Sequence, residues 1–263
     1  MWNVRGINKE KKQRYLNWLV GEQRPDIVMF NETKLMSTLY LDGYFSHQTL
    51  LKRSGGCITF SNLKNHRRVK ALGTYLNWSK VLLGSEELHI MNVYIEPGHE
   101  SFVVKRADTI ITLVKSVIRQ DASAKIIVGG DLNGQLQRVH TALLLAGFAP
   151  TLKAGTVTHR EGNQLDQLWT RNVTILKAIV ADPIDQVSDH NLIQVKLEAT
   201  LIERGQPFQE DLGEVDLRTL PQSAIRKIIQ ECVKEGLFED TPDIHKVPLL
   251  SQVPADIIEL FRP

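Results

Sequence analysis

Several side chains that could bind a metal ion or a phosphate stand where an apolar, strand-like run of the sequence ends. Glu32 follows the run 27–30, and Asp131 and Asn133 follow the run 126–128. Strand ends at one edge of a sheet are places where polar side chains can converge over a ligand. Carboxylates bind hard cations such as Mg²⁺, which can neutralise the charge of a phosphate ester and activate water. Residues of these types at converging strand ends could therefore hold a ligand together with a hard cation.

Further polar candidates lie next to apolar runs, and they are Tyr94, Asp166, Asp189 and His190. Taken one at a time, each has a plainer interpretation as a solvated strand end, a helix cap or an ordinary loop residue. Asp131, for example, lies in a Gly-rich turn and could simply cap the helix after it. The combination and the order of these residues are harder to ascribe to chance.

The elements that would position these residues succeed one another without regular alternation through the first 200 residues. Short β-rich runs bounded by Gly, Pro or Asn predict strands at 26–30, 57–60, 81–83, 88–94 and 125–128. Apolar residues at helical spacing predict helices at 9–20, 102–119 and 136–145. Residues 156–170 predict a hairpin with its turn at 161–163. This order favours an α+β fold, a two-sheet β-sandwich flanked by helices.

The last part of the chain has a different character from the first. Residues 201–263 are punctuated by Pro and hold 7 basic and 12 acidic residues, with one amphipathic helix predicted at about 222–233. Because the whole chain has a formal charge of +2, residues 1–200 carry +7. We therefore predict a catalytic domain over 1–200, whose basic charge suits a polyanionic substrate, and an acidic extension over 201–263.

Cysteine content and hydropathy bear on the cellular environment. Cys57 and Cys232 are far apart, which predicts neither a disulfide framework nor a zinc site and favours a reducing compartment. The apolar runs are far shorter than the ~20 residues that cross a bilayer, and no signal peptide is evident. We expect a soluble intracellular protein without membrane contact.

In chain order, the polar blocks resemble those of the endonuclease/exonuclease/phosphatase superfamily. This superfamily includes DNase I-like nucleases, exonuclease III-like abasic endonucleases and the endonucleases of LINE-type (non-LTR) retrotransposons. The blocks are Trp-Asn-Val-Arg-Gly (2–6), Asn-Glu-Thr-Lys (31–34), Asn-Val-Tyr (92–94), Gly-Asp-Leu-Asn (130–133), Leu-Asp-Gln-Leu (165–168) and Ser-Asp-His (188–190). Their residues are most similar to those of the LINE branch.

The resemblance implies a metal site that holds Mg²⁺, with Mn²⁺ as a substitute. Glu32 matches the metal-ligating Glu of the family, Asn3 lies beside it, and Asp189 matches a further carboxylate of the metal site. The resemblance also implies the fold of the family, a DNase I-like four-layer sandwich.

The catalytic residues that the resemblance implies lie in the later blocks. Asp131 would orient or deprotonate the attacking water, while Asn133 and Tyr94 would contact the scissile phosphate. His190 matches the catalytic His and Asp166 its acidic partner, which would favour the imidazolium form.

Two departures from the family pattern stand near the beginning of the sequence. The first strand that normally precedes Trp-Asn is missing, because Trp2 comes directly after Met1. Arg5 stands where the abasic-site relatives have an acidic residue, which weakens the abasic-endonuclease interpretation.

Two segments are candidates for DNA contact. Arg67 and Arg68 belong to a basic stretch, 62–70, that we expect to be a loop, and such residues attract backbone phosphates. In LINE endonucleases a hairpin matching 156–170 reaches into the DNA groove, which implies that role for Thr158, His159 and Arg160.

The resemblance thus implies a Mg²⁺-dependent endonuclease that nicks double-stranded DNA and leaves a 3′-hydroxyl for a reverse transcriptase to extend. The chain would then be part of a longer polyprotein with a reverse transcriptase and would act in the nucleus. Two alternatives remain open. One is an abasic-site or general repair endonuclease of the same superfamily, and the other is a catalytically silent nucleic-acid-binding relic.

Overall fold

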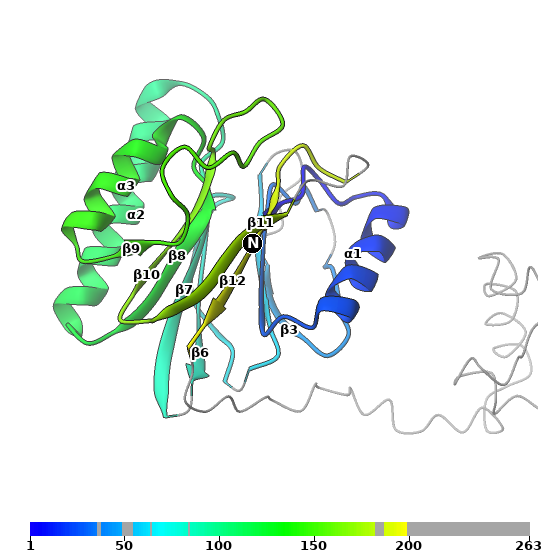
Figure 1. The fold of residues 1–263 in the computed structure, drawn as a ribbon, viewed down its shortest axis with the longest axis horizontal. Coiled ribbons are helices and arrows are strands. Elements are labelled where there is room, and N and C mark those ends of the chain that lie inside the picture. Colours follow the sequence, from blue (N-terminus) through cyan, green and yellow to red (C-terminus); the bar gives the residue numbers. More distant parts are fainter. Residues whose placement is uncertain (36–37, 49–54, 64, 84, 182–186, 199–263) are drawn as a thin grey trace, which may run out of the picture. The chain divides into compact units, whose positions relative to one another are not determined.

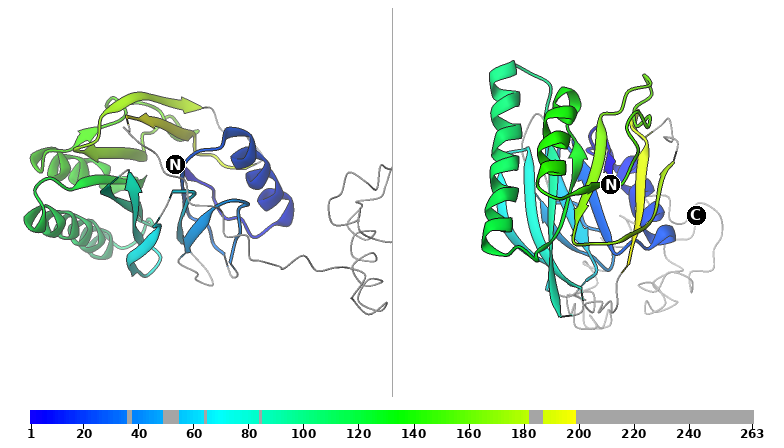
Figure 2. Two further views of the ribbon diagram at one scale, coloured as in Figure 1. Left: turned by 90° about the horizontal axis from the view of Figure 1, so that it is seen from below. Right: turned by 60° about the vertical axis from the view of Figure 1, so that its left-hand side comes forward.

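The structure, a computed structural model, describes residues 1–35, 38–48, 55–63, 65–83, 85–181 and 187–198. In this part of the chain two sheets face each other, with helices on their outer sides (Figure 1). Figure 2 shows the same layers from two further directions, with the α2/α3 pair on one side and α1 on the other. The predicted α+β sandwich is confirmed. The extension 201–263 and its predicted helix lie outside the described residues.

The first sheet has four strands in the order β1-β2-β4-β3. Helix α1 packs against it through Leu16 and Val20, which lie four residues apart on one helical face and are buried with Phe30 and Phe60. The elements are β1 (Trp2–Asn3), α1 (Glu10–Gln23), β2 (Ile27–Asn31), β3 (Phe45–Gln48) and β4 (Cys57–Ser61).

The second sheet has six strands in the order β5-β6-β7-β8-β10-β9, and a separate pair joins β11 to β12. The strands are β5 (Arg67–Leu72), β6 (Leu76–Leu83), β7 (Glu86–Tyr94), β8 (Lys125–Asp131), β9 (Ala149–Pro150), β10 (Asp166–Arg171), β11 (Ile175–Ala181) and β12 (Leu192–Leu197). The helices are α2 (Glu100–Gln120) and α3 (Leu136–Leu145), with a 3₁₀ turn, η1, at Asn133–Gln135.

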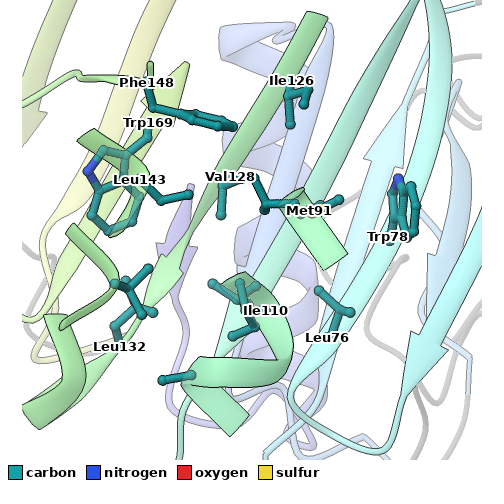
Figure 3. Close-up of a cluster of buried hydrophobic side chains, with 14 of the residues drawn as sticks. Leu76, Trp78, Met91, Ile110, Ile126, Val128, Leu132, Leu143, Phe148 and Trp169 are labelled. Atoms are coloured by element: carbon teal, nitrogen blue, oxygen red, sulfur yellow. The ribbon is translucent and has the colours of Figure 1, made fainter. Parts of the chain in front are cut away.

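The main core lies between the six-stranded sheet and α2 and α3 (Figure 3). Met91 of β7, Val128 of β8 and Trp169 of β10 meet Ile110 of α2 and Leu143 of α3 in this layer, and all five are nearly inaccessible to solvent. Burial of side chains of this size contributes about 1.5–3 kcal/mol each, which makes β7 and β8 rigid supports for the residues at their carboxyl ends.

The first sheet does not lack its edge strand as expected, because Trp2 and Asn3 themselves form the short strand β1. Trp2 and Asn3 pair in parallel with Phe30 and Asn31 of β2. The backbone of Met1 exchanges two hydrogen bonds with Ile193 of β12, of 2.8 and 3.0 Å. These pairings hold Asn3 between two strands even though β1 contains only two residues.

Two other expectations about local structure are wrong. The stretch 62–70 is not simply a loop, because β5 begins at Arg67 and forms the edge of the six-stranded sheet. Residues 156–165 form a loop and not a hairpin strand. Strand β10 pairs instead with β8 and β9, because its buried side chains require a place inside the sheet. No helix in the described part of the chain is long and apolar enough to cross a membrane.

Candidate active site

Candidate residues from both sheets meet where β1, β2, β7 and β8 end. Asn3 is fully buried, and its side-chain amide donates hydrogen bonds to Glu32 Oε2 at 3.1 Å and to Asp131 Oδ2 at 2.8 Å. Glu32 comes directly after β2 in the first sheet, whereas Asp131 ends β8 in the second. One amide thus links two carboxylates that lie 99 positions apart in the sequence.

Asp131 is almost completely buried beside another carboxylate. It pairs in register with Asp166 on the neighbouring strand β10, and both side chains are only 1% exposed. Burial, reinforced by the charge of Asp166, raises the pKa of Asp131 to about 7. Two carboxylates that are this poorly solvated leave the site with a strong electrostatic preference for a cation.

Asp166 and His190 form a buried pair. Nδ1 of His190 lies 2.8 Å from Asp166 Oδ2, and Nε2 of the same ring lies 3.9 Å from Asp131 Oδ2. Burial lowers the pKa of His190, but the hydrogen bond and charge of Asp166 outweigh it, so the net pKa is raised. The ring therefore tends to be charged, and its Nε2 points to the carboxylate centre.

Two of the candidate residues, Glu32 and Asn133, have backbone conformations that residues other than glycine rarely adopt. The φ angles of Glu32 and Asn133 are 51° and 45°, in the left-handed region. Such conformations cost on the order of 1 kcal/mol or more and persist where the surroundings determine them. At Asn133 the reason is visible, since its N–H donates to Asp131 Oδ1 at 2.9 Å and its amide donates to the Ile95 carbonyl at 2.9 Å.

Tyr94 closes β7 next to the end of β8. It pairs in register with Asp131, and the residue is 4% exposed. Burial, together with the charges of Glu32 and Asp131, raises the pKa of the Tyr94 hydroxyl, so it remains a neutral hydrogen-bond donor. Tyr94 therefore lies at the same strand ends as Glu32 and Asp131.

Basic side chains surround the acidic centre on its accessible side. Lys34 Nζ lies 2.5 Å from Glu32 Oε1, and Arg5 Nη1 lies 2.6 Å from Asp189 Oδ2. Burial raises the pKa of Asp189, but hydrogen bonding and the Arg5 charge lower it overall. Asp189 is therefore ionised. It lies beside His190 and is not part of the hydrogen-bond network in which Asn3 joins Glu32 to Asp131.

The loop 158–160 lies against the Asp166–His190 pair, but its residues differ in access. Thr158 is fully buried, and its hydroxyl accepts hydrogen bonds from the N–H groups of Leu165 and Asp166 at 2.9 and 3.0 Å. Its side chain is therefore not available for the DNA contact expected of it. His159 packs edge-on against His190, whereas the Arg160 side chain is on the surface.

The other expected DNA contacts lie away from the site. Arg67 is level with Lys80 and His89 in the six-stranded sheet, five residues from Tyr94 along β7. At ~3.4 Å per residue this is about 17 Å along the strand alone. The Arg67 side chain also forms an ion pair with Glu87. Arg67 and Arg68 are therefore not brought together with the catalytic candidates.

Three residues that support the site were not among the sequence candidates. Ser188 donates from its hydroxyl to the Asn3 carbonyl at 2.6 Å and accepts the His190 N–H at 3.1 Å. Asn31 and Asn92, both fully buried, hydrogen-bond to each other across the two sheets at 2.6 Å. All three lie within the polar blocks. An uncharged polar residue inside or next to an apolar strand is the sequence feature that could have identified them.

The fold and the site together define a DNase I-like α+β sandwich with carboxylates and an Asp–His pair at its strand ends. The sequence model of the Endonuclease/Exonuclease/phosphatase family matches residues 2–190. The chain belongs to this family. No curated protein sequence matches it significantly.

Solved structures share the architecture at low sequence identity. The AP endonuclease LMAP from Leishmania major has a TM-score of 0.62 at 16% identity, over 76% of this chain and 86% of that one. The 3′ phosphatase NExo from Neisseria, bound to a product DNA hairpin, has a TM-score of 0.60 at 14% identity, over 75% and 97%. TDP2 from Caenorhabditis elegans, in truncated form, has a TM-score of 0.54 at 18% identity, over 75% and 96%. At these identities the likeness concerns the fold alone.

Proposed function

We propose that the chain is a divalent-metal-dependent endonuclease that hydrolyses phosphodiester bonds in double-stranded DNA. One observation carries the proposal: the Asn3 amide joins Glu32 to Asp131, and His190 Nε2 lies 3.9 Å from that same Asp131 oxygen. Carboxylates for a cation and a charged donor for phosphate oxygens are thus side by side, as hydrolysis of an anionic ester requires.

The residues present fit a hard cation. Asp131 is buried with a raised pKa, and Asp166 Oδ1 is buried without a hydrogen-bond partner among the described residues. Glu32 would hold the ion, because its side chain is 16% exposed and can be reached from solvent. Asn3, which hydrogen-bonds to Glu32, would contribute from the same side, and Asp189 would contribute from the side of His190. Mg²⁺, or Mn²⁺ in its place, would neutralise phosphate charge and activate water.

The chain's own groups have distinct tasks in this proposal. Asp131 accepts a hydrogen bond from the attacking water and can take up its proton, for which a raised pKa is suitable. His190, held by Asp166, donates from Nε2 to a phosphate oxygen. Tyr94 and Asn133 border the same centre and position the phosphate as neutral donors.

At a finer level, we infer a LINE-type enzyme that nicks intact duplex DNA and leaves a 3′-hydroxyl for a reverse transcriptase. The support is the residue content of the first, second and last polar blocks and the ion pair of Arg5 with Asp189. On this proposal the chain is part of a longer polyprotein and acts in the nucleus.

The competing enzyme activity is cleavage at abasic sites. Its support is the shared fold with AP endonucleases, including one from Archaeoglobus fulgidus with a TM-score of 0.57 at 14% identity. A catalytically silent relic is disfavoured, because Asn3, Glu32, Asp131, Asp166 and His190 are all in contact or hydrogen-bonded in one network.

A plasmid assay tests the proposal. Purified protein should convert supercoiled plasmid to the open circle with Mg²⁺ and not with excess chelator, and a polymerase should extend the nicks directly. A protein without any metal-dependent nicking would be a relic. A competition between matched duplexes, one with a single abasic analogue, separates the two enzymes: the LINE-type interpretation expects little preference, whereas a preference of many orders of magnitude establishes the repair interpretation.

A further inference from the structure

A second group of potential metal ligands lies on the outer side of the catalytic centre. His159, Asp189 and His190 each offer a ligand atom, and these atoms lie within 4.8 Å of one another. His159 Nε2 is 3.6 Å from Asp189 Oδ2, and the two His rings meet edge-on with centroids 4.7 Å apart. Two imidazoles and one carboxylate on one face differ in chemistry from the carboxylate and amide set around Glu32.

Each ligand is held in place by other groups. His190 presents Nδ1 to Asp166, which leaves Nε2 as its free nitrogen, and a carboxylate behind a ligating imidazole fixes its tautomer and increases its basicity. His159 is fixed through its backbone, which forms an isolated bridge with His190. Asp189 Oδ1 is a buried atom without a hydrogen-bond partner in the described part of the chain. The oxygen that faces His159 is Oδ2, so a cation that the carboxylate binds through both of its oxygens would also satisfy Oδ1.

We propose that His159, Asp189 and His190 bind a first-row transition-metal ion, with Zn²⁺ as the fitting case, and that this ion inhibits the enzyme by occupying His190 Nε2. Imidazole nitrogens suit Zn²⁺, whereas Mg²⁺ takes oxygen ligands in near-octahedral geometry. The two kinds of ion therefore prefer different sets of ligands. Metal binding is inferred from this geometry alone, whereas inhibition also rests on the proposed nuclease function.

Binding of the metal ion would replace two interactions of its ligands, the hydrogen bond of Glu161 with His159 and the ion pair of Arg5 with Asp189. The Glu161 N–H donates to His159 Nδ1 at 3.3 Å, so the proton of the neutral ring lies on Nε2. On metal binding the proton of the neutral His159 ring must move from Nε2 to Nδ1, which then no longer accepts from Glu161, and the proton on His190 Nε2 must be released to solvent. Arg5 competes for Asp189, but its side chain is 61% exposed and can turn into water. Its positive charge lowers the affinity for a cation without blocking access.

The direct test is titration of the metal-free 263-residue chain with Co²⁺, whose visible absorption is strong in four-coordinate sites and weak in octahedral ones. The decisive variant is His159→Phe, which keeps an aromatic ring against His190 and removes the ligand nitrogen Nε2 together with Nδ1. His99→Phe, on the exposed residue before α2, is the matched control. Arg5→Ala removes the competing cation. Glu32→Ala removes a ligand of the proposed catalytic ion and leaves the three new ligands intact.

The parent and the His99→Phe and Glu32→Ala variants should develop the intense Co²⁺ bands, and Zn²⁺ should bleach them. His159→Phe should bind at least ten-fold more weakly, and Arg5→Ala several-fold more tightly. Circular dichroism checks that each variant is folded. In nicking assays with excess Mg²⁺, each normalised to its zinc-free rate, half-inhibition of His159→Phe should need at least ten-fold more Zn²⁺.

Unchanged Co²⁺ affinity in folded His159→Phe would overturn the site, whatever the protein's nuclease activity. If the parent protein forms the Co²⁺ complex but nicks DNA equally well with Zn²⁺ bound, the proposed inhibition is wrong. A protein that binds Co²⁺ through His159 and never nicks DNA would uphold the binding site and refute the proposed function.

Discussion

Asn31 and Asn92 hydrogen-bond to each other across the two sheets directly beneath the candidate site. Asn31 donates to Asn92 Oδ1 at 2.6 Å and to the Val93 carbonyl at 2.8 Å. Asn92 donates in turn to the carbonyls of Phe30 and Ile58, at 3.1 and 2.7 Å. The pair therefore fixes the end of β2, next to Glu32, against the end of β7, where Tyr94 lies.

We expect Asn92→Ala to lower the free energy of unfolding by about 2–4 kcal/mol, because it removes one buried acceptor of the Asn31 amide and the side-chain donor to the carbonyls of Phe30 and Ile58. Urea denaturation monitored by circular dichroism measures this. Asn163→Ala, on an exposed loop residue, is the control and should shift stability by less than about 0.5 kcal/mol. Equal stabilities of the two variants would contradict the bridging role.

Glu32→Ala and Asp131→Ala should each abolish nicking while DNA binding survives. These carboxylates hold the proposed cation and water, whereas phosphate affinity comes mainly from Lys and Arg. Plasmid nicking and fluorescence anisotropy with a duplex oligonucleotide report the two properties separately. Wild-type nicking by either folded variant would remove that residue from the catalytic set.

Thr158→Val should reduce the nicking rate by at least ten-fold with little change in DNA affinity. The substitution keeps the shape of the side chain but leaves the N–H groups of Leu165 and Asp166 without their acceptor, which loosens Asp166 behind His190. Thr158→Ser retains the hydroxyl and should restore most of the activity. If Thr158→Val instead weakens DNA binding and keeps the rate at saturating DNA, Thr158 contacts DNA after all.

Gly130→Ala should prevent stable folding. A Cβ at this position would lie 1.7 Å from the Val93 carbonyl oxygen in the neighbouring strand β7, and the φ angle of 150° is unusual for residues with side chains. No rotation of a flexible side chain can relieve a clash with backbone. Soluble yield and the circular dichroism melting curve test this, with Gly134→Ala, where a Cβ meets nothing within 4 Å, as the control.

His89 should make the fold sensitive to acid. Burial lowers the pKa of His89 to about 4 from a usual 6.5, and Trp78 Nε1 donates to its Nδ1 at 3.2 Å, which requires an unprotonated nitrogen. Between these two pKa values the unfolded chain binds the proton and the folded chain does not. The contribution of His89 is therefore fully present above pH 6.5 and is lost progressively as the pH falls toward 4.

The measurement is the free energy of unfolding at pH 7 and pH 5 in the parent and in His89→Phe. The loss on acidification should be smaller in the variant by on the order of 1–2 kcal/mol. Parallel pH dependences would show that His89 titrates normally in the folded protein.

Much of the architecture could be predicted because it depends on local pattern. The helix predicted at 136–145 agrees with α3, and the five strands predicted from short β-rich runs are all present, though β6 begins at Leu76. Burial of one face requires apolar residues to recur at a fixed spacing in each helix or strand, and this spacing can be read from consecutive residues. Strands β5 and β11 are among those that were not predicted, since both are largely exposed and their residues do not alternate strictly between apolar and polar.

The residue types of the site were also evident in the sequence, since carboxylates, amides and a His each stand beside an apolar run. Their contacts were not, because Asn3 reaches Asp131 across 128 positions and Ser188 reaches Asn3 across 185. Chain order says which strands exist, but the pairing of β1 with β2 and of β8 with β10 decides which of their ends meet. Packing of the loop also buried Thr158, and the pairing of β5 with β6 placed Arg67 away from the site, which no local pattern encodes. Contact between distant residues is a property of packing, and only the tertiary structure determines it.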